Sequence, residues 1–467
     1  MTGHEPLDHK APHPQGSPMT TSTDFLPPRP AAPARFPRGM RALYASATDL
    51  LSLFPETAFR HRMMPFSAIS QRVLIVNEPE MVRRVFITGR AEFEAKSRHF
   101  RQALEPVIGD SMFLNSGEVW LTRRALMAKL LHPSRTPGFH PLFVQGAEEL
   151  ARSWNGRVDV AAGFAAATAL AVMRALFGDA ARPEDAAKLA RSFTAYEGAV
   201  LAVDFAHVFG LPEKLTGWQF HTARRHARAI RRLCSACIAA AGPDVGGLFG
   251  ELRAALAEDG RPLLDPTQLI NEVAMLLLAG SETTANVLTW TVYLLALHQP
   301  TRERVLAELE AVLGGRAPEA SELNALPFTK AVIQEAMRLY PPVPYLSREA
   351  ARAERIAGIQ VKPGETVMAL PWLLHRNEHL WEAPHAFRPE RFLPDAPQKP
   401  PQFGYLPFSI GPRVCAGASF AMAEMLVFMA VLLPRLDFSI PPGAAPVPRA
   451  RLTLRPRGGM PLMVTPR

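Results

Sequence analysis

Cysteine is scarce in this chain, which has three among 467 residues. That number excludes a disulfide scaffold and fits a reducing compartment, so we expect a cytoplasmic protein. The chain also lacks long basic runs with interleaved aromatic residues, and we expect no nucleic-acid binding although the net charge is +9. Acidic residues are missing after Asp437, where five arginines leave an acidic protein partner open as an alternative: Arg449, Arg451, Arg455, Arg457 and Arg467.

Motifs of several cofactor classes are missing too. The histidines show no H-E-x-x-H pattern or other metal spacing, and no G-x-G-x-x-G follows a predicted strand. We therefore expect no histidine metal site and no nicotinamide or flavin site. A single C-x-x-C, Cys234 to Cys237, lies in a helical stretch without a second pair, and we interpret both cysteines as structural.

No signal peptide or membrane span is predicted. Residues 1–40 contain nine prolines and no apolar run of signal-peptide length. We expect residues 1–35 to form a disordered leader and residues 36–467 to form the folded body. The most apolar long segment, Leu269–Leu297, is long enough to span a bilayer, but a carboxylate at its middle, Glu282, would be costly there. We therefore predict a helix that is buried in protein.

Helical patterns dominate the folded body. Asp265-Pro266-Thr267-Gln268 combines an N-cap Asp, a Pro at the first helical position and a Gln at the third, which predicts a helix from there to about His298. Further helices are expected over 79–90, 117–131, 144–154, 160–178, 183–199, 218–241, 245–258, 300–313, 328–339 and 417–433, and strands over 68–76, 356–361, 366–370 and the chain end. The fold class is therefore α+β, mainly α-helical with a small β-sheet region. Because no linker or repeat follows residue 40, we expect one large domain.

The most informative stretch is Phe408–Gly417, with the sequence F-S-I-G-P-R-V-C-A-G. Its glycines and proline predict a tight loop around one sulfur, and an apolar helix follows. Cys415 would then lie at a helix N-terminus, where the dipole and the unpaired N–H groups favour a thiolate. Arg413 adds positive charge two residues away. A lone cysteine is more often an inert core residue, but this setting favours a ligand.

The pattern F-x-x-G-x-R-x-C-x-G resembles the signature of the cytochrome P-450 haem-thiolate monooxygenases at every defined position. The resemblance extends over about residues 40–467 and implies that the cofactor is haem b, with Cys415 as the axial thiolate ligand of its iron. It also implies that Phe408 packs beside the sulfur, that Arg413 pairs with a haem propionate and that Gly417 belongs to the cofactor-binding loop.

Glu335 and Arg338 form an E-x-x-R pattern 80 residues before Cys415 (415 − 335). Alone, this spacing is typical of a weak exposed ion pair on one helix face. The order of motifs resembles the family's buried Glu–Arg pair, which a third charged group completes, here Arg391. The resemblance implies a structural network that fixes the cysteine loop.

Ala279-Gly280-Ser281-Glu282-Thr283-Thr284 lies in the middle of the long predicted helix. A glycine there costs about 1 kcal/mol relative to alanine, and a close helix contact is one explanation for it. The pattern is similar to the family's oxygen-binding groove, to which Ala279 and Gly280 would belong. There Thr283 would hydrogen-bond dioxygen and Glu282 would relay protons from solvent.

Trp120 and Arg124 are spaced to share one face of a predicted helix. A core Trp beside a solvated Arg is the simpler interpretation, whereas the resemblance implies contact with a haem propionate. Arg348, after the turn at 341–344, resembles a further propionate-binding residue.

The resemblance implies an enzyme that inserts one oxygen atom from O2 into a C–H or C=C bond of an apolar small molecule. The electrons would come from a separate ferredoxin and its reductase, because the haem domain uses nearly the whole chain. Arg123 and Lys129 would contribute to a basic docking face, and the protein would be a monomer. We expect the pocket to be lined from 100–114, 275–283, 343–346 and 460–462.

Two alternatives are kept. A peroxide-driven hydroxylase or isomerase of the same family would typically lack the threonine at position 283, so Thr283 argues against it. A non-catalytic haem sensor would differ by failing to turn over.

Overall fold

The computed structural model describes residues 24–68, 71–200, 221–242, 245–257 and 259–467. Its helices are α1 Gly39–Thr48, α2 Pro79–Arg83, α3 Arg98–Ile108, α4 Gly117–Leu130, α5 Thr136–Ser153, α6 Val160–Phe177, α7 Pro183–Ala199, α9 His221–Ala241, α10 Gly247–Ala254, α11 Pro266–Leu297, α12 Gln299–Leu313, α13 Pro327–Leu339, α14 Pro371–Leu374 and α15 Ala418–Leu432. Its strands are β1 Met63–Ala68, β2 Gln71–Val76, β3 Gly156–Asp159, β4 Leu346–Glu349, β5 Glu354–Ile356, β6 Ile359–Val361, β7 Thr366–Ala369, β8 Leu436–Ser439, β9 Pro448–Ala450, β10 Leu454–Pro456 and β11 Pro461–Pro466. The predicted class, mainly α-helical with a small β region, is confirmed.

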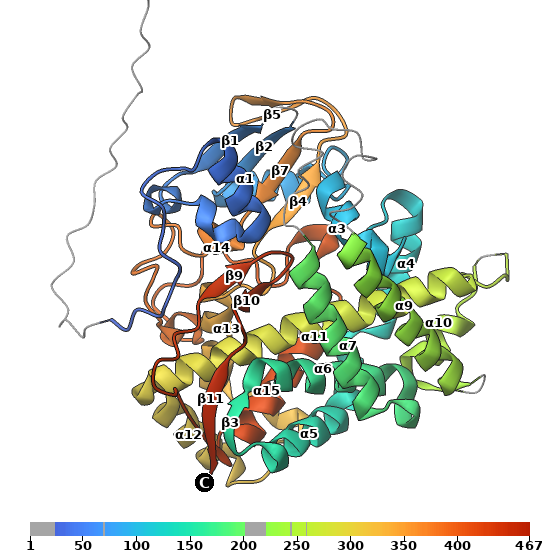
Figure 1. Cartoon of the computed structure of the whole chain (residues 1–467), viewed down its shortest axis with the longest axis vertical. Coiled ribbons are helices and arrows are strands. Elements are labelled where there is room, and N and C mark those ends of the chain that lie inside the picture. Colours follow the sequence, from blue (N-terminus) through green and yellow to red (C-terminus); the bar gives the residue numbers. More distant parts are fainter. Residues whose placement is uncertain (1–23, 69–70, 201–220, 243–244, 258) are drawn as a thin grey trace, which may run out of the picture.

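The largest sheet joins segments that are far apart in the sequence. Its strand order is β1-β2-β7-β4, with β1 and β2 antiparallel, β2 and β7 parallel, and β7 and β4 antiparallel. In Figure 1 this sheet lies at one end of the molecule and the helices α5, α6, α11 and α15 lie at the other. The sheet carries Arg348 on β4, opposite Val367 of β7.

Helix α11 crosses the helical part of the molecule, as Figure 1 shows in yellow. The predicted capping box is present, since Asp265 Oδ1 accepts from the Gln268 N–H at 2.8 Å and Gln268 Oε1 accepts from the Asp265 N–H at 3.0 Å. The helix packs against α6, α13 and α15, and most of its side chains are buried. A helix that is apolar nearly all round suits this central position.

Helix α6 begins at an Asp159 N-cap and is buried along most of its length. The segment Val160–Ala180 is long and apolar enough to cross a membrane, and 67% of its most apolar window is buried inside the molecule. Its neighbours are α5, α7 and α11. The core position of α6 accounts for its apolar composition without a membrane.

The folded body begins earlier than the predicted boundary at residue 36. Phe387 N–H donates to the Phe25 carbonyl at 3.0 Å, the Phe25 ring stacks on His298 at 5.0 Å, and Tyr340 Oη donates to the Pro28 carbonyl at 2.7 Å. Residues 24–35 therefore pack on the body, because their proline-rich backbone offers carbonyls to buried donors. The remainder of the predicted leader, residues 1–23, lies outside the described residues, as do residues 218–220 of one predicted helix.

Three helices lie where no helix was expected: α1, α3 and the four-residue α14. Helix α1 follows a proline-rich stretch, and α3 carries Pro106 inside it. Prolines before or inside a helix weaken the helical pattern of the sequence. Tertiary packing outweighs this effect in α3, which packs against α9 and α11.

Candidate active site

The cysteine loop is closed by backbone hydrogen bonds. The Cys415 N–H donates to the Phe408 carbonyl at 2.9 Å, and the Val414 N–H donates to the Gly411 carbonyl at 3.0 Å. Gly411 has φ +71°, and a Cβ there would collide with the Phe86 carbonyl oxygen. Only glycine fits this position, because the loop packs directly on another backbone.

A cavity of about 250 Å³ opens beside this loop. It is lined by nine of the residues predicted to form the site: Cys415, Arg413, Phe408, Trp120, Arg124, Ala279, Gly280, Thr283 and Gly417. The exposed part of Cys415 therefore faces an internal space. Burial raises the pKa of the Cys415 thiol, whereas the Gly417 N–H and the charge of Arg124 lower it. The helix terminus acts in the predicted direction, but the charge that lowers the pKa of Cys415 belongs to Arg124 and not to Arg413, and desolvation outweighs both.

Buried cations gather on one side of this cavity. Lys96 lines it, and burial together with the charges of Arg348 and Arg413 holds the pKa of its ammonium well below its usual range. Burial lowers the pKa of Arg348 to about 9 and that of Arg413 to about 10. Within the described residues, no ion pair joins Lys96, Arg124 or Arg348 to a carboxylate; Arg413 reaches only Glu94, at 3.9 Å. Such desolvated cations need an anionic partner.

Arg413 is held in place by aromatic and backbone contacts. Its guanidinium lies 4.4 Å from the Trp120 ring and donates to the Asn115 carbonyl at 2.7 Å. Arg348 lies behind the cavity wall, where it donates to the Ser347 carbonyl at 2.9 Å and stacks on Phe86 at 4.9 Å. Trp120 and Arg413 thus form part of the cavity wall. Arg348 does not line the cavity, and its positive charge lies behind that wall.

Helix α11 supplies the opposite wall of the cavity. A Cβ on Gly280 would lie 3.0 Å from Val172 Cγ2 of α6, so the close helix contact considered from the sequence is present. Thr283 faces the cavity and its hydroxyl donates to the Ala279 carbonyl at 2.8 Å. Its oxygen lone pairs are left free to accept a hydrogen bond.

Glu282, the acid proposed from the sequence to relay protons, does not lie on the cavity that Thr283 faces. It is absent from the lining of the cavity and is instead buried in an ion pair with Arg455 of β10, while Asn286 Nδ2 donates to its Oε1 at 3.0 Å. Arg455 is shared with Glu197 of α7 at 2.7 Å, and burial raises the pKa of Glu197 to about 7. The Glu282 carboxylate and the Thr283 hydroxyl therefore face different surroundings, because neighbouring residues of a helix point about 100° apart.

Glu335 and Arg338 are fully buried, each with 0% of its side chain exposed. Arg338 donates to both Glu335 oxygens at 2.7 Å, and to the carbonyls of His375, Pro384 and Ala386 at 2.7–2.8 Å. Glu335 Oε1 also accepts from Arg391 Nε at 3.3 Å and from the Arg388 N–H at 2.8 Å. The three charged residues named from the sequence form one network, and Arg388 joins it through its backbone.

His375 links this network to the cysteine loop. Its carbonyl accepts from Arg338, and its Nε2 accepts from the Leu406 N–H at 2.8 Å, two residues before Phe408. Burial and the nearby charge of Arg338 lower the pKa of His375 to about 3, so the ring is neutral and can accept this bond. Nothing in the local sequence marks His375, because both partners are distant in the chain.

Glu424 of α15 is a further buried acid that the motifs did not identify. It is completely buried, and neither carboxyl oxygen makes a well-formed hydrogen bond within the described residues. Burial raises the pKa of Glu424 well above its usual range, and the nearby Thr284 hydroxyl offsets this only in part. Glu424 is therefore a buried acid with a raised pKa between α15 and α11.

Two expectations about the surroundings of the cavity need correction. Arg123 is buried and pairs with Glu272 at 3.1 Å, so it contributes no surface charge. Met460 and Leu462 are fully buried and do not line the cavity, because the final strand β11 pairs with β3 and β8. Lining residues do come from the other three expected segments, including Phe100, Met275 and Val343.

These surroundings fit haem. Among the described residues, no cluster of three or more His, Cys, Asp or Glu side chains could hold a metal ion, so a metal at Cys415 would need ligands from a non-protein group. The porphyrin supplies four nitrogen ligands, and its propionates are the anions that the cations around the cavity lack. A single thiol at a helix start, facing an apolar cavity with unpaired cations, defines a haem-thiolate enzyme.

The comparisons with known proteins agree with this class. The family model "Cytochrome P450" matches residues 50–463. Cyclooctatin synthase of Streptomyces melanosporofaciens is 28% identical over 381 residues, which cover 80% of this chain and 83% of that protein. Cytochrome P450 714B1 of Oryza sativa subsp. japonica is 28% identical over 84% of this chain and 77% of its own length. Cytochrome P450 4A14 of Rattus norvegicus is 40% identical over 44% of this chain and 40% of its own.

The chain belongs to the cytochrome P450 family, as the signature indicated. It is an oxidoreductase of the monooxygenase type with haem as its cofactor, and it uses O2, an organic substrate and a redox partner.

Proposed function

We propose that the protein is a cytoplasmic, monomeric monooxygenase that inserts one atom of O2 into a C–H or C=C bond of an apolar small molecule. The observation that carries this proposal is the cavity that Cys415 and Thr283 share. Its other walls are mainly apolar and include Phe100, Phe113 and Met275. Such walls favour an apolar substrate, because burial of apolar surface drives binding.

In this proposal Cys415 would hold the haem through its sulfur, and Arg124, Arg413 and Lys96 would bind the propionates, with Arg348 behind them. Bound haem supplies oxygen activation, which a thiolate ligand favours. Phe408 and Gly417 shape the loop around the sulfur, and the Glu335 network holds that loop through His375 and Leu406.

Thr283 is the proposed proton-handling group. Its hydroxyl already donates to the Ala279 carbonyl, so it can exchange that partner for one in the cavity without moving its backbone. Glu282 is held on the other side of α11 by Arg455 and Asn286. A role for Glu282 in proton supply therefore requires its ion pair to open first.

The proposed electron donor is an acidic ferredoxin with its reductase, docking over the cysteine loop. Val119 and Leu121 of α4, the helix that also carries Trp120 and Arg124, are exposed. Lys129, on the same helix, is an exposed cation. Apolar residues beside a positive charge suit a transient partner of opposite charge.

The test is turnover with ferredoxin, reductase and isotopically labelled O2. The proposal requires one labelled atom in the product and one in water. A product formed only with added hydrogen peroxide would favour the peroxide-driven alternative, which the presence of Thr283 at the cavity disfavours. Haem binding without any turnover across a compound library would favour the sensor.

A further inference from the structure

A second and larger cavity, about 1280 Å³ in volume, lies between α1 and the segment around β9. It is bordered by residues 33–38, by α1, by the turn at 55–61 and by the segment around β9. None of its lining residues lines the haem cavity. We call it the arginine groove, because five arginines line it: Arg35, Arg38, Arg41, Arg449 and Arg457. Two of them belong to the basic C-terminal segment that the proposed function leaves unexplained.

The arginine groove carries uncompensated positive charge. Its lining contains five arginines and a single carboxylate, Asp49, so its net charge is +4 (5 − 1) without counting His61. The Asp49 carboxylate already accepts two backbone hydrogen bonds at Oδ1, from the Leu51 N–H at 3.1 Å and from the Ala450 N–H at 3.0 Å. Within the described residues, none of the five arginines forms an ion pair with a carboxylate, whereas many other arginines of this chain do.

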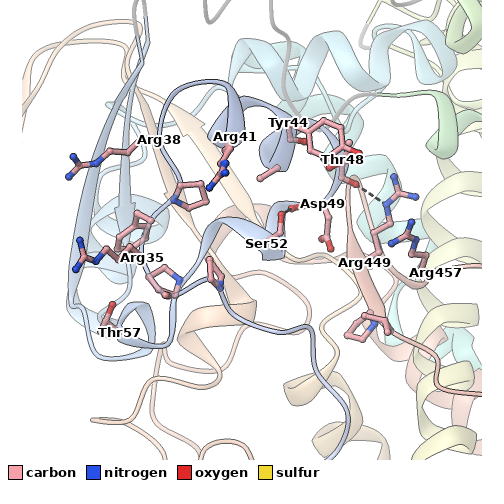
Figure 2. Close-up of a pocket in the computed structure, with 18 of the residues that line it drawn as sticks. Arg35, Arg38, Arg41, Tyr44, Thr48, Asp49, Ser52, Thr57, Arg449 and Arg457 are labelled. Carbon is pink, nitrogen blue, oxygen red and sulfur yellow. Dashed lines mark hydrogen bonds between the residues drawn. The ribbon is translucent and has the colours of Figure 1, made fainter.

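The arginines approach the groove from two sides. Figure 2 shows Arg35 and Arg38 on the side of the N-terminal segment, and Arg449 and Arg457 on the side of β9, with Asp49 and Ser52 between them. Arg449 is anchored, since its Nε donates to the Thr48 carbonyl at 2.8 Å. Its other guanidinium N–H groups remain available. In Figure 2 the guanidinium groups of Arg35 and Arg38 point away from those on the β9 side, so the groove offers separate guanidinium groups, each of which suits an anion with several acceptor oxygens.

The rim of the groove is partly apolar. Tyr44 is 71% exposed and Val447 is 42% exposed, and both line the groove. Prolines and Phe36 add further apolar surface. A ligand with anionic oxygens and an apolar part would contact the arginines with its oxygens and the rim with its apolar part.

We propose that the arginine groove binds a phosphate-bearing anion. Phosphate fits because its oxygens accept bidentate bonds from arginine, and because no carboxylate of the groove is free to compete. Two sources share this chemistry: the headgroup of an anionic phospholipid at a bilayer surface, and a free phosphorylated small molecule. Since the two cavities share no lining residue, occupancy of the groove leaves haem ligation unchanged.

The test uses the haem-loaded protein and two probes. Inorganic pyrophosphate is titrated by calorimetry, and mixed phosphatidylglycerol–phosphatidylcholine vesicles are tested by co-sedimentation, each at low and high salt. The groove variant is Arg38→Gln/Arg41→Gln/Arg457→Gln. The control variant, Arg152→Gln/Arg157→Gln/Arg191→Gln, removes the same charge from α5, β3 and α7.

We expect the parent and the control variant to bind at least one probe in a salt-dependent manner, and the groove variant to lose about tenfold or more in affinity. Binding of pyrophosphate supports a free phosphorylated ligand, and binding of vesicles alone supports a lipid headgroup. Three results would overturn the proposal: no binding of either probe, equal losses in both variants, or displacement by polyglutamate but not by pyrophosphate, which would indicate an acidic peptide. The spectrum of the reduced CO complex is measured on both variants. An unchanged spectrum shows that a loss of anion binding does not come from a damaged haem site.

Discussion

Removal of the Arg338 side chain should destabilise the protein far more than its E-x-x-R spacing suggests. Arg338→Ala deletes a guanidinium that makes five hydrogen bonds, two to Glu335 and three to backbone carbonyls. Breaking a buried ion pair costs about 3–5 kcal/mol, because the remaining charge stays desolvated. Arg391 and the Arg388 N–H still contact Glu335 and soften the loss, so we expect the lower half of that range.

The chain contains its own control. Glu80 and Arg83 of α2 have the same spacing and equally short contacts, with Arg83 Nη2 donating to Glu80 Oε1 at 2.6 Å. Their side chains are 68% and 40% exposed, respectively. Water already solvates both groups, so Arg83→Ala should leave stability unchanged within error.

The assay compares urea unfolding midpoints and the haem content of the purified proteins. Arg338→Ala should unfold at lower urea and bind less haem, because the His375 carbonyl and the segment leading to the cysteine loop lose their support. Arg83→Ala should match the parent in both readings. Full haem loading and an unchanged midpoint in Arg338→Ala would refute the argument that burial gives this pair its role.

Three further outcomes are expected. Thr283→Ala should consume NAD(P)H at a comparable rate but release mostly hydrogen peroxide, because the cavity loses its hydroxyl; unchanged coupling would exclude the proton-handling role. Glu424→Gln should match the parent in stability below the usual pKa of a glutamate and exceed it as the pH rises above that value, because the unfolded chain then releases a proton that the folded protein still holds; an equal difference in stability at every pH would contradict this. Lys129→Gln should slow reduction by an acidic ferredoxin at low salt only, and the matched exposed lysine variant Lys188→Gln should not; equal rates in all three proteins would remove Lys129 from the docking face.

Much of the site could be predicted because the motifs that form it are short, continuous stretches of the sequence. The loop from Phe408 to Cys415 carries its own glycine, proline and arginine, and each has a steric or electrostatic reason that a single segment reveals. The helix start at Asp265 is likewise local, since its capping box spans four residues. Such features depend little on the rest of the fold.

The remainder depends on partners that are distant in the chain. Glu282 pairs with Arg455, 173 residues away, and that contact turns its carboxylate from the cavity. Lys96 has no distinguishing neighbours in the sequence, and only the fold brings it to the cavity beside Arg348 and Arg413. The predicted surface charge of Arg123 failed for the same reason, because Glu272 of α11 covers it.

Electronic absorption of the reduced CO complex tests the central claim most directly. The three cysteines of the chain provide the comparison, since Cys234 and Cys237 are buried on α9 and neither lines the haem cavity. Cys415→Ser should abolish the strongly red-shifted Soret band that thiolate ligation produces. Cys234→Ser and Cys237→Ser should retain the band. An unchanged thiolate spectrum in Cys415→Ser would contradict the assignment of Cys415 as the haem ligand.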